Sequence, residues 1–307
     1  MSQTHIHPSA IIHPKAEIAD GVTIGPYCVI GHSVKIGSGT VLASHVVIDP
    51  YTTVGSDCDI APFAVLGGKP QDHSYKDERS FVEIGDRVLI REAATINRAT
   101  GEDKVTRVGD GSMIMAYSHL AHNVVVGKEV TIANNVQLAG YVEIGDYSFI
   151  SGSNVFHQFV RMGRYSIMGG FSGTRQDIPP FSMTDGRLAT VVGINKVGLR
   201  RRGFSQEERH RIRKAFQMLW LTKSNFPEAL ASVEEEMGFD PHIQELLAFI
   251  KTSKRGIRRP IIEASQLEEP GLELDAAEDM LEDEDMRRGR ESALREVDHL
   301  EAYHGAS

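Results

Sequence analysis

A six-residue repeat runs through most of the chain. Apolar residues, mostly aliphatic, occupy 25 positions that are multiples of six, from Ile6 to Leu66, from Ile84 to Ile96 and from Val108 to Met168. A period of six fits neither the 3.6-residue turn of an α-helix nor the alternation of a simple strand. It fits a parallel β-helix, in which each hexapeptide supplies a short strand and a corner, and stacked coils share one continuous core.

The repeat resembles that of the hexapeptide-repeat acyltransferases, which implies a left-handed triangular coil with three repeats per turn. Handedness follows from this resemblance alone, because most parallel crossovers are right-handed. From Ala10 to Ala64, the fourth residue after the repeat aliphatic is small or β-branched, and Cys28 and Cys58 occupy this slot. We therefore expect both thiols to be packed in the core. So few cysteines make no disulfide framework, which agrees with a cytoplasmic location.

The chain divides into three parts by composition. A mainly β fold, the parallel β-helix, is expected over residues 1–190, with polar excursions at 68–82 and 97–107. Such excursions from a solenoid often serve binding, although they could equally be plain surface loops. A C-terminal α-helical domain is expected over 191–260, where Ser205 and Glu208 predict a capping box and an apolar stripe of helical period follows: Ile212, Ala215, Phe216 and Leu219. Further helices are predicted at about 227–237 and 241–254.

Charge is distributed unevenly. Residues 263–307 hold 15 Asp/Glu and four Arg, so 261–307 is expected to be a disordered acidic tail. Eight Lys/Arg and two Glu lie between Lys196 and Lys214. This basic run is either a solvated surface or a docking site for an acidic partner, and it lacks the interleaved aromatics of nucleic-acid binders. No secretory signal and no run of 18 apolar residues occur, so no membrane span is expected.

The segment "SHLAHN" places His119 and His122 three residues apart. On a helix they would share a face, but in the predicted coil they lie on either side of a corner. With three repeats per turn, His122, Tyr141 and His157 fall on successive rungs of one face, and His122 lies roughly 10 Å from His157. A small-molecule site is one interpretation and solvated rung residues are another. A zinc site like that of γ-class carbonic anhydrases is a third, although the histidine spacing does not match.

From residue 1 to about 257 the chain resembles the UDP-N-acetylglucosamine O-acyltransferase family of lipid A biosynthesis. The segments that carry the resemblance are "PQDHSY", "SHLAHN", "ANNVQLAG", "VFHQF", "MGGFSG", "QDIPPF", "GINKVGLRRRGFS" and "FIKTSKRGI". It implies a homotrimer with active sites between subunits and no cofactor or metal. The implied reaction moves an (R)-3-hydroxyacyl group from acyl carrier protein to the 3-position of UDP-N-acetylglucosamine.

The resemblance also implies residue roles. His122 corresponds to the general base, a task that suits histidine because its ordinary pKa lies near neutrality. The backbone N–H of Gly140 corresponds to the oxyanion donor. Gly170 corresponds to the position that helps set acyl-chain length. The implied substrate-binding residues are Asp72, His119, Tyr141, His157 and Gln158 around the sugar, with Asn195 and Arg201 at the nucleotide.

Three residues depart from the family pattern. Asn123 follows the base where an acidic residue commonly stands, Tyr141 replaces a histidine and Ser74 replaces a lysine. A 3-amino sugar nucleotide therefore stays open as acceptor. The N-acyltransferase of the same pathway, which normally has a domain before the repeats, would share the coil. A coenzyme A-dependent sugar acetyltransferase and a non-catalytic scaffold are also compatible with the repeat.

Overall fold

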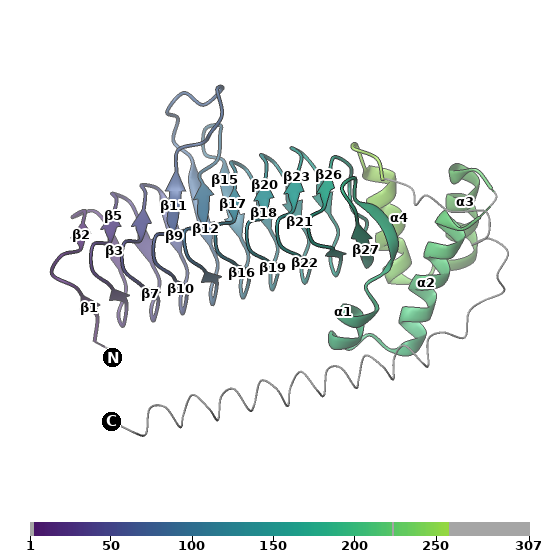
Figure 1. Ribbon diagram of the computed structural model, residues 1–307, viewed down its shortest axis with the longest axis horizontal. Helices are drawn as coiled ribbons and strands as arrows, with labels where there is room; N and C mark the ends of the chain where they lie inside the picture. Colours follow the sequence, from purple (N-terminus) through teal and green to yellow (C-terminus); the bar gives the residue numbers. More distant parts are fainter. Residues whose placement is uncertain (1–2, 223, 258–307) are drawn as a thin grey trace, which may run out of the picture. The chain divides into compact units, whose positions relative to one another are not determined.

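The structure is a computed structural model that describes residues 3–222 and 224–257, so the predicted acidic tail at 261–307 lies outside the described residues. Short strands follow one another around a coil and form three sheets, in which every third strand pairs in parallel up to β26 (Figure 1). The 11-stranded sheet contains β1 (His5–Ile6), β4 (Thr23–Ile24), β7 (Val41–Leu42), β10 (Asp59–Ile60), β13 (Leu89–Ile90), β16 (Met113–Ile114), β19 (Thr131–Ile132), β22 (Phe149–Ile150), β25 (Ile167–Met168), β27 (Ser182–Asp185) and β28 (Thr190–Ile194).

The nine-stranded sheet contains β2 (Ile11–Ile12), β5 (Val29–Ile30), β8 (Val47–Ile48), β11 (Val65–Gly68), β14 (Thr95–Asn97), β17 (His119–Leu120), β20 (Gln137–Leu138), β23 (Val155–Phe156) and β26 (Gly173–Thr174). The eight-stranded sheet contains β3 (Glu17–Ile18), β6 (Lys35–Ile36), β9 (Thr52–Val54), β12 (Phe81–Ile84), β15 (Val105–Val108), β18 (Val125–Val126), β21 (Glu143–Ile144) and β24 (Arg161–Met162). The parallel β-helix predicted from the repeat is confirmed.

The repeat aliphatics fill the axis of the coil. They are buried from Ile24 to Met168, whereas Ile6, Ile12 and Ile18 are more exposed because the first coil has no neighbour on its outer side. Cys28 and Cys58 are buried as expected, and burial raises the pKa of both thiols. Packing therefore accounts for the cysteines, and the core extends along the whole coil.

Most corners of the coil turn through a residue with left-handed backbone geometry. The residue three after a repeat aliphatic usually has a positive φ, for example 60° at Asn123 and 62° at Tyr141. Asparagine tolerates this conformation better than most residues, whereas a bulky aromatic needs support from its surroundings. Tyr141 has this support, because its ring stacks on Phe159 of the next coil with 4.7 Å between ring centroids.

The two excursions leave the coil between β11 and β12 and between β14 and β15, and the first rises above the coil in Figure 1. Arg98 ties them together. Its side chain is buried and donates from Nε to the hydroxyl of Tyr75 at 3.1 Å and from Nη1 to the carbonyl of Pro50 at 3.4 Å. The excursion is thus attached to the coil by specific hydrogen bonds.

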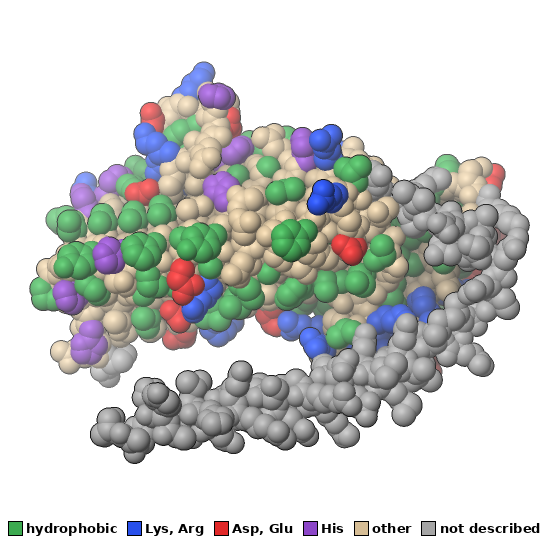
Figure 2. All heavy atoms as spheres, in the orientation of Figure 1, with side chains coloured by type: hydrophobic (Ala, Val, Ile, Leu, Met, Phe, Trp, Pro, Cys, Tyr) green, Lys and Arg blue, Asp and Glu red, His purple; other side chains and the backbone are tan. Residues whose placement is uncertain are grey.

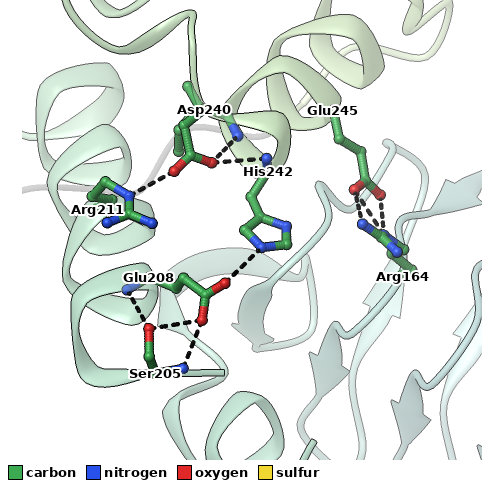
Figure 3. A network of polar contacts seen from close by, with 8 residues as sticks. Arg164, Ser205, Glu208, Arg211, Asp240, His242 and Glu245 are labelled. Atoms are coloured by element: carbon green, nitrogen blue, oxygen red, sulfur yellow. Dashed lines mark hydrogen bonds and ion pairs between the residues drawn. The ribbon is translucent and has the colours of Figure 1, made fainter. Parts of the chain in front are cut away.

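The chain ends in four helices within the described residues: α1 (Lys196–Arg201), α2 (Gln206–Trp220), α3 (Phe226–Met237) and α4 (Pro241–Thr252). Strand β28 precedes them and pairs antiparallel with β27, so residues 191–194 are strand rather than helix. The predicted capping box of Ser205 and Glu208 is present, and the predicted stripe of α2 is buried. Arg164 of the coil donates to Glu245 of α4, as Figure 3 shows.

Asp240 caps α4 and joins it to α2. Its carboxylate accepts from the backbone N–H of His242 at 2.8 Å and from Arg211 Nε at 2.6 Å (Figure 3). Burial by itself raises the pKa of Asp240, but Arg211 and the backbone N–H groups outweigh it and the pKa is lowered. A lowered folded-state pKa adds stability that is present above the unfolded-state pKa and is lost as the pH falls.

Asp240→Asn is therefore expected to reduce the free energy of unfolding by on the order of 2 kcal/mol at neutral pH. The difference from the unaltered chain should shrink when the pH falls below about 4. Urea unfolding at neutral and acid pH measures both effects. Glu234→Gln, which removes an exposed ion pair with Lys251, is the matched control and should cost less than about 1 kcal/mol. Equal losses in the two variants would contradict the assignment.

Candidate active site

His122 stands at the corner after β17 and is 5% exposed. Its Nδ1 lies 2.9 Å from Asn123 Oδ1. Thr100 determines which way the Asn123 amide faces, because Oδ1 accepts from the Thr100 N–H at 2.9 Å and Nδ2 donates to the Thr100 carbonyl at 3.0 Å. Nδ1 of His122 therefore faces an acceptor and carries the ring proton, which leaves a lone pair on Nε2.

Asp72, from the first excursion, faces the other side of the ring. Its Oδ2 lies 3.7 Å from His122 Nε2, too far for a hydrogen bond but close enough for electrostatic interaction. Ser74 holds the carboxylate with its backbone N–H and its hydroxyl, both at 2.9 Å. These hydrogen bonds from Ser74 are the main reason that the pKa of Asp72 is lowered, and His122 adds to the effect. The carboxylate is thus ionised at neutral pH beside the basic ring nitrogen.

Gly140 lies one coil further along, directly against the imidazole. A Cβ at this position would be 2.5 Å from both Cε1 and Nε2 of His122, so only glycine admits the ring here. The Gly140 carbonyl accepts from Phe159 N at 3.1 Å. Its N–H donates no hydrogen bond within residues 3–222 and 224–257. This N–H is therefore free to donate to a ligand bound beside Nε2.

His119 occupies β17, just before the corner that carries His122. Its Nδ1 lies 2.8 Å from Thr95 Oγ1 in the neighbouring strand β14. Burial lowers the pKa of His119, and the proximity of His122 lowers it further. His119 is therefore neutral at neutral pH and is suited to hydrogen bonding rather than to carrying charge.

Tyr141 lies on the rung between His122 and His157. Its ring meets the His122 imidazole edge-on, with 5.3 Å between centroids, and stacks on Phe159. His157 and Gln158 follow β23, and the predicted stacking of the repeats at Leu120, Leu138 and Phe156 is confirmed by the strand register. Arg255 Nη2 lies 2.9 Å from His157 Nδ1.

Arg255 and Phe159 contact predicted site residues, His157 and Tyr141, and sequence reasoning missed them. The segment "FIKTSKRGI" contributes to the family resemblance, but no spacing rule places it against residues almost a hundred positions earlier. Phe159 belongs to the quoted "VFHQF" segment and could have been found from its position 18 residues after Tyr141, since three hexapeptides separate stacked corners.

The other predicted site residues lie elsewhere in the single chain. Asn195 precedes α1, where its Oδ1 accepts from Gly198 N at 3.0 Å and its Nδ2 donates to the Tyr165 carbonyl at 2.8 Å. Arg201 is in the last turn of α1. In Figure 1 α1 lies below the coil, whereas the first excursion rises above it. Gly170 lies at the corner between β25 and β26.

A half-open cavity of about 300 Å³ lies next to the rung of His157, whose N–H donates to the Thr174 carbonyl at 2.9 Å. Its lining mixes apolar and polar residues: Gly173, Thr174, Arg175, Gln176, Leu188 and Ala189. It is positioned to extend the site along the coil, away from His122.

Metal-binding clusters and membrane-spanning helices are both absent from the described part of the chain. No group of three or more His, Cys, Asp or Glu there is arranged to hold a metal ion. Among the same residues, no helix is both long enough and apolar enough to cross a membrane.

The chain belongs to a known class of transferase. Bacterial transferase hexapeptide models match residues 3–35, 15–50 and 106–140. The model for domain 2 of UDP N-acetylglucosamine O-acyltransferase matches residues 177–258. The chain therefore contains the hexapeptide coil of these transferases, and its helical end matches one particular family of them.

Similar proteins and solved structures point to the same family as the models. Proteins named acyl-[acyl-carrier-protein]–UDP-N-acetylglucosamine O-acyltransferase from Thermodesulfovibrio yellowstonii and Thiobacillus denitrificans are 48% and 47% identical, each over 255 residues, covering 83% of this chain and 99% of the relative. The UDP-N-acetylglucosamine acyltransferase structure from Francisella novicida has a TM-score of 0.81 and 38% identity, covering 83% of this chain and 94% of that one. The Moraxella catarrhalis O-acyltransferase has a TM-score of 0.80 and 41% identity, covering 83% and 99%. The chain belongs to the acyl-[acyl-carrier-protein]–UDP-N-acetylglucosamine O-acyltransferase family and is an acyltransferase.

Proposed function

We propose that the chain transfers an (R)-3-hydroxyacyl group from acyl carrier protein to the 3-hydroxyl of UDP-N-acetylglucosamine, the first step of lipid A biosynthesis. The relatives' name specifies the donor and the acceptor. The observation that carries the mechanism is the state of His122. Asn123 and Thr100 hold its proton on Nδ1, so that the free Nε2 faces Asp72 beside Gly140.

In this mechanism His122 Nε2 takes the proton of the sugar hydroxyl while the hydroxyl oxygen attacks the thioester carbonyl carbon. A C–O bond forms, and the carbonyl oxygen becomes an oxyanion that accepts from the Gly140 N–H. Collapse of this intermediate breaks the C–S bond. The imidazolium then returns its proton to the departing thiolate of the carrier protein, so the enzyme ends in its starting state.

Asp72 compensates for the missing charge at Asn123. An asparagine orients the base but supplies no charge to stabilise an imidazolium. The ionised Asp72 carboxylate supplies that charge from the Nε2 side, 3.7 Å from the nitrogen that gains the proton. Ser74, which departs from the family lysine, contributes by fixing this carboxylate with two hydrogen bonds.

His119, Tyr141, His157 and Gln158 are proposed to hold the sugar, since they lie beside His122 or on the next two rungs of the same face. Asn195 uses both polar side-chain atoms within the fold, so its proposed contribution is to fix the start of α1. Arg201 is proposed to reach the nucleotide across a subunit boundary.

A homotrimer would create that boundary. Hydrophobic side chains are prominent along the coil surface that Figure 2 shows, and exposed examples in the described residues include Val155 at 53% and Phe171 at 80%. Surfaces of this kind usually mark an interface. Light scattering is expected to give three times the 33.8 kDa of one chain. A monomer would contradict the shared site.

Acyl carrier protein is acidic, and the basic run around α1 and α2 is the proposed docking surface. The chain itself already pairs part of this run, through Arg202 with Glu129, Arg211 with Asp240 and Lys214 with Glu236. The charge offered to the carrier is therefore smaller than the sequence suggests. No nucleic acid is expected as a partner. We place the reaction in the cytoplasm.

The activity test incubates the purified chain with UDP-N-acetylglucosamine and a panel of (R)-3-hydroxyacyl carrier proteins of different lengths. Mass spectrometry should detect a sugar nucleotide heavier by one acyl group. A parallel reaction with the 3-amino analogue tests the second acceptor, and preferred acylation of that amine would correct the acceptor assignment. No acylated nucleotide in either reaction would overturn the proposed function.

Gly170→Met is predicted to shorten the acyl chain that the enzyme prefers. The nearest atom to a Cβ at Gly170 is the Gly152 carbonyl oxygen at 3.5 Å, so the fold accommodates a side chain. Methionine would fill space that the proposed chain path leaves open, and each excluded methylene should cost about 0.8 kcal/mol. Competition between short and long acyl donors measures the change. An unchanged ratio in a folded variant would remove Gly170 from the acyl path.

A further inference from the structure

Arg255 makes hydrogen bonds to two residues of the substrate site. Its Nη2 lies 2.9 Å from His157 Nδ1 and also donates to the Gln158 carbonyl oxygen. His157 Nδ1 also lies 3.2 Å from the Gln158 carbonyl oxygen, an acceptor that would favour a proton on Nδ1. Arg255 donates to that oxygen as well, and because a guanidinium only donates, Nδ1 accepts from Arg255 and the ring proton is placed on Nε2. The guanidinium carbon also lies 6.0 Å from the centre of the Phe159 ring. Arg255 thus determines which ring nitrogen His157 presents as a donor.

The segment that carries Arg255 is fixed by a buried carboxylate. Asp177 is 3% exposed, its N–H donates to the Gly256 carbonyl at 2.9 Å, and its Oδ2 accepts from Ser253 Oγ at 2.8 Å. The same side chain accepts from Arg161 N at 2.8 Å through Oδ1. Residues 253–257 are therefore anchored on the end of the coil on both sides of Arg255, and the guanidinium reaches His157 from an ordered backbone.

Among the described residues, His157 has no competitor of opposite charge for the Arg255 guanidinium. In the described part of the chain no carboxylate lies within ion-pair distance of Arg255, so no internal anion draws the guanidinium away from His157. The rings of Phe159, Tyr141 and His122 contact one another in sequence: Phe159 stacks on Tyr141, and Tyr141 meets His122 edge-on. One row of contacts therefore joins the chain segment after α4 to the base.

We propose that Arg255 is a positioning residue of the active site. It holds His157 as an Nε2–H donor toward the acceptor sugar and fixes the Gln158 backbone beside it. Because Asp177 anchors the segment that carries Arg255, the position of His157 also depends on how residues 253–257 pack against the coil. The proposal rests on the proposed function, since it assigns His157 and Gln158 to the substrate.

The contact itself is tested without turnover. Nitrogen-15 NMR of histidine-labelled protein, with His157 assigned from a His157→Gln variant, should show an unprotonated Nδ1 and a protonated Nε2. In Arg255→Ala the two signals should move toward the averaged values of an exchanging ring. Identical His157 signals with and without Arg255 would overturn the proposal, whether or not the chain proves to be the expected acyltransferase.

The functional consequence is tested by kinetics. Arg255→Ala should lower kcat/KM by about tenfold or more, because a misplaced His157 would bind the transition state less tightly. Lys254→Ala is the matched control: it removes the same charge from the neighbouring, exposed residue and should change kcat/KM less than about twofold. Arg255→Lys, which keeps the charge and one donor group, should recover part of the loss.

A double variant separates positioning from an independent role. If Arg255 acts through His157, adding Arg255→Ala to His157→Ala should cost no more than about twofold beyond His157→Ala alone. Losses that multiply would show that Arg255 acts separately and would overturn the proposal. An inactive parent chain would instead contradict the proposed function, and the NMR result would still decide whether the contact exists.

Discussion

His122→Ala is expected to lower kcat by at least about a hundredfold, the usual contribution of a positioned general base. The ring is buried, so bulk water does not readily replace the lost Nε2. The neighbouring His119 is held by Thr95 through its Nδ1. Initial rates at saturating donor and acceptor measure the loss. Added imidazole should restore part of the rate by entering the cavity that the variant creates.

The control for this variant is His13→Ala, which removes an exposed histidine on the N-terminal coils. It should keep the turnover of the unaltered chain. Both variants should show a cooperative thermal unfolding transition, which shows that they are folded. Near-normal turnover of folded His122→Ala would return His122 to the role of a structural corner residue and would require another base.

Gly140→Ala is predicted to have an effect of similar size for a different reason. The added methyl would lie 2.5 Å from Cε1 and Nε2 of His122, and the ring, being buried, has little room to yield. A displacement of the base on the order of 1 Å costs about a hundredfold in rate. The measurement is again kcat, together with the melting temperature of each variant.

Two variants isolate the clash. Gly193→Ala adds a methyl where no atom lies within 4 Å, and it should leave turnover and stability nearly unchanged. Adding Gly140→Ala to His122→Ala removes the ring that the methyl strikes, so the double variant should be as stable as His122→Ala. A Gly140→Ala enzyme with normal kcat would mean that the ring does not stand where the structure places it.

The coil could be predicted from the sequence because its core depends on a local rule. Every sixth residue must be apolar to fill the axis, and this rule repeats over more than 150 residues. The same register places His122, Tyr141 and His157 on three successive rungs of one face. Cys28 and Cys58 can be assigned to packing for the same reason. A repeated local constraint leaves little freedom in the fold.

The details of the site could not be predicted, because they depend on contacts between distant segments. Nothing in "SHLAHN" shows that Thr100 determines how the Asn123 amide faces, or that Asp72 approaches Nε2 from the first excursion. The contact of Arg255 with His157 crosses 98 positions. The family resemblance predicts that Asn195 binds the nucleotide, and the structure adds that it caps α1, which the sequence did not predict.

The most direct measurement is the position of the acyl group in the reaction product. Two-dimensional NMR of the nucleotide sugar formed from UDP-N-acetylglucosamine and an (R)-3-hydroxyacyl carrier protein identifies the acylated oxygen. We predict an ester at the 3-oxygen of the glucosamine ring, formed by the unaltered chain and at least about a hundredfold more slowly by His122→Ala. Acylation at another position, or equal rates of 3-O-acylation by the two proteins, would contradict the mechanism.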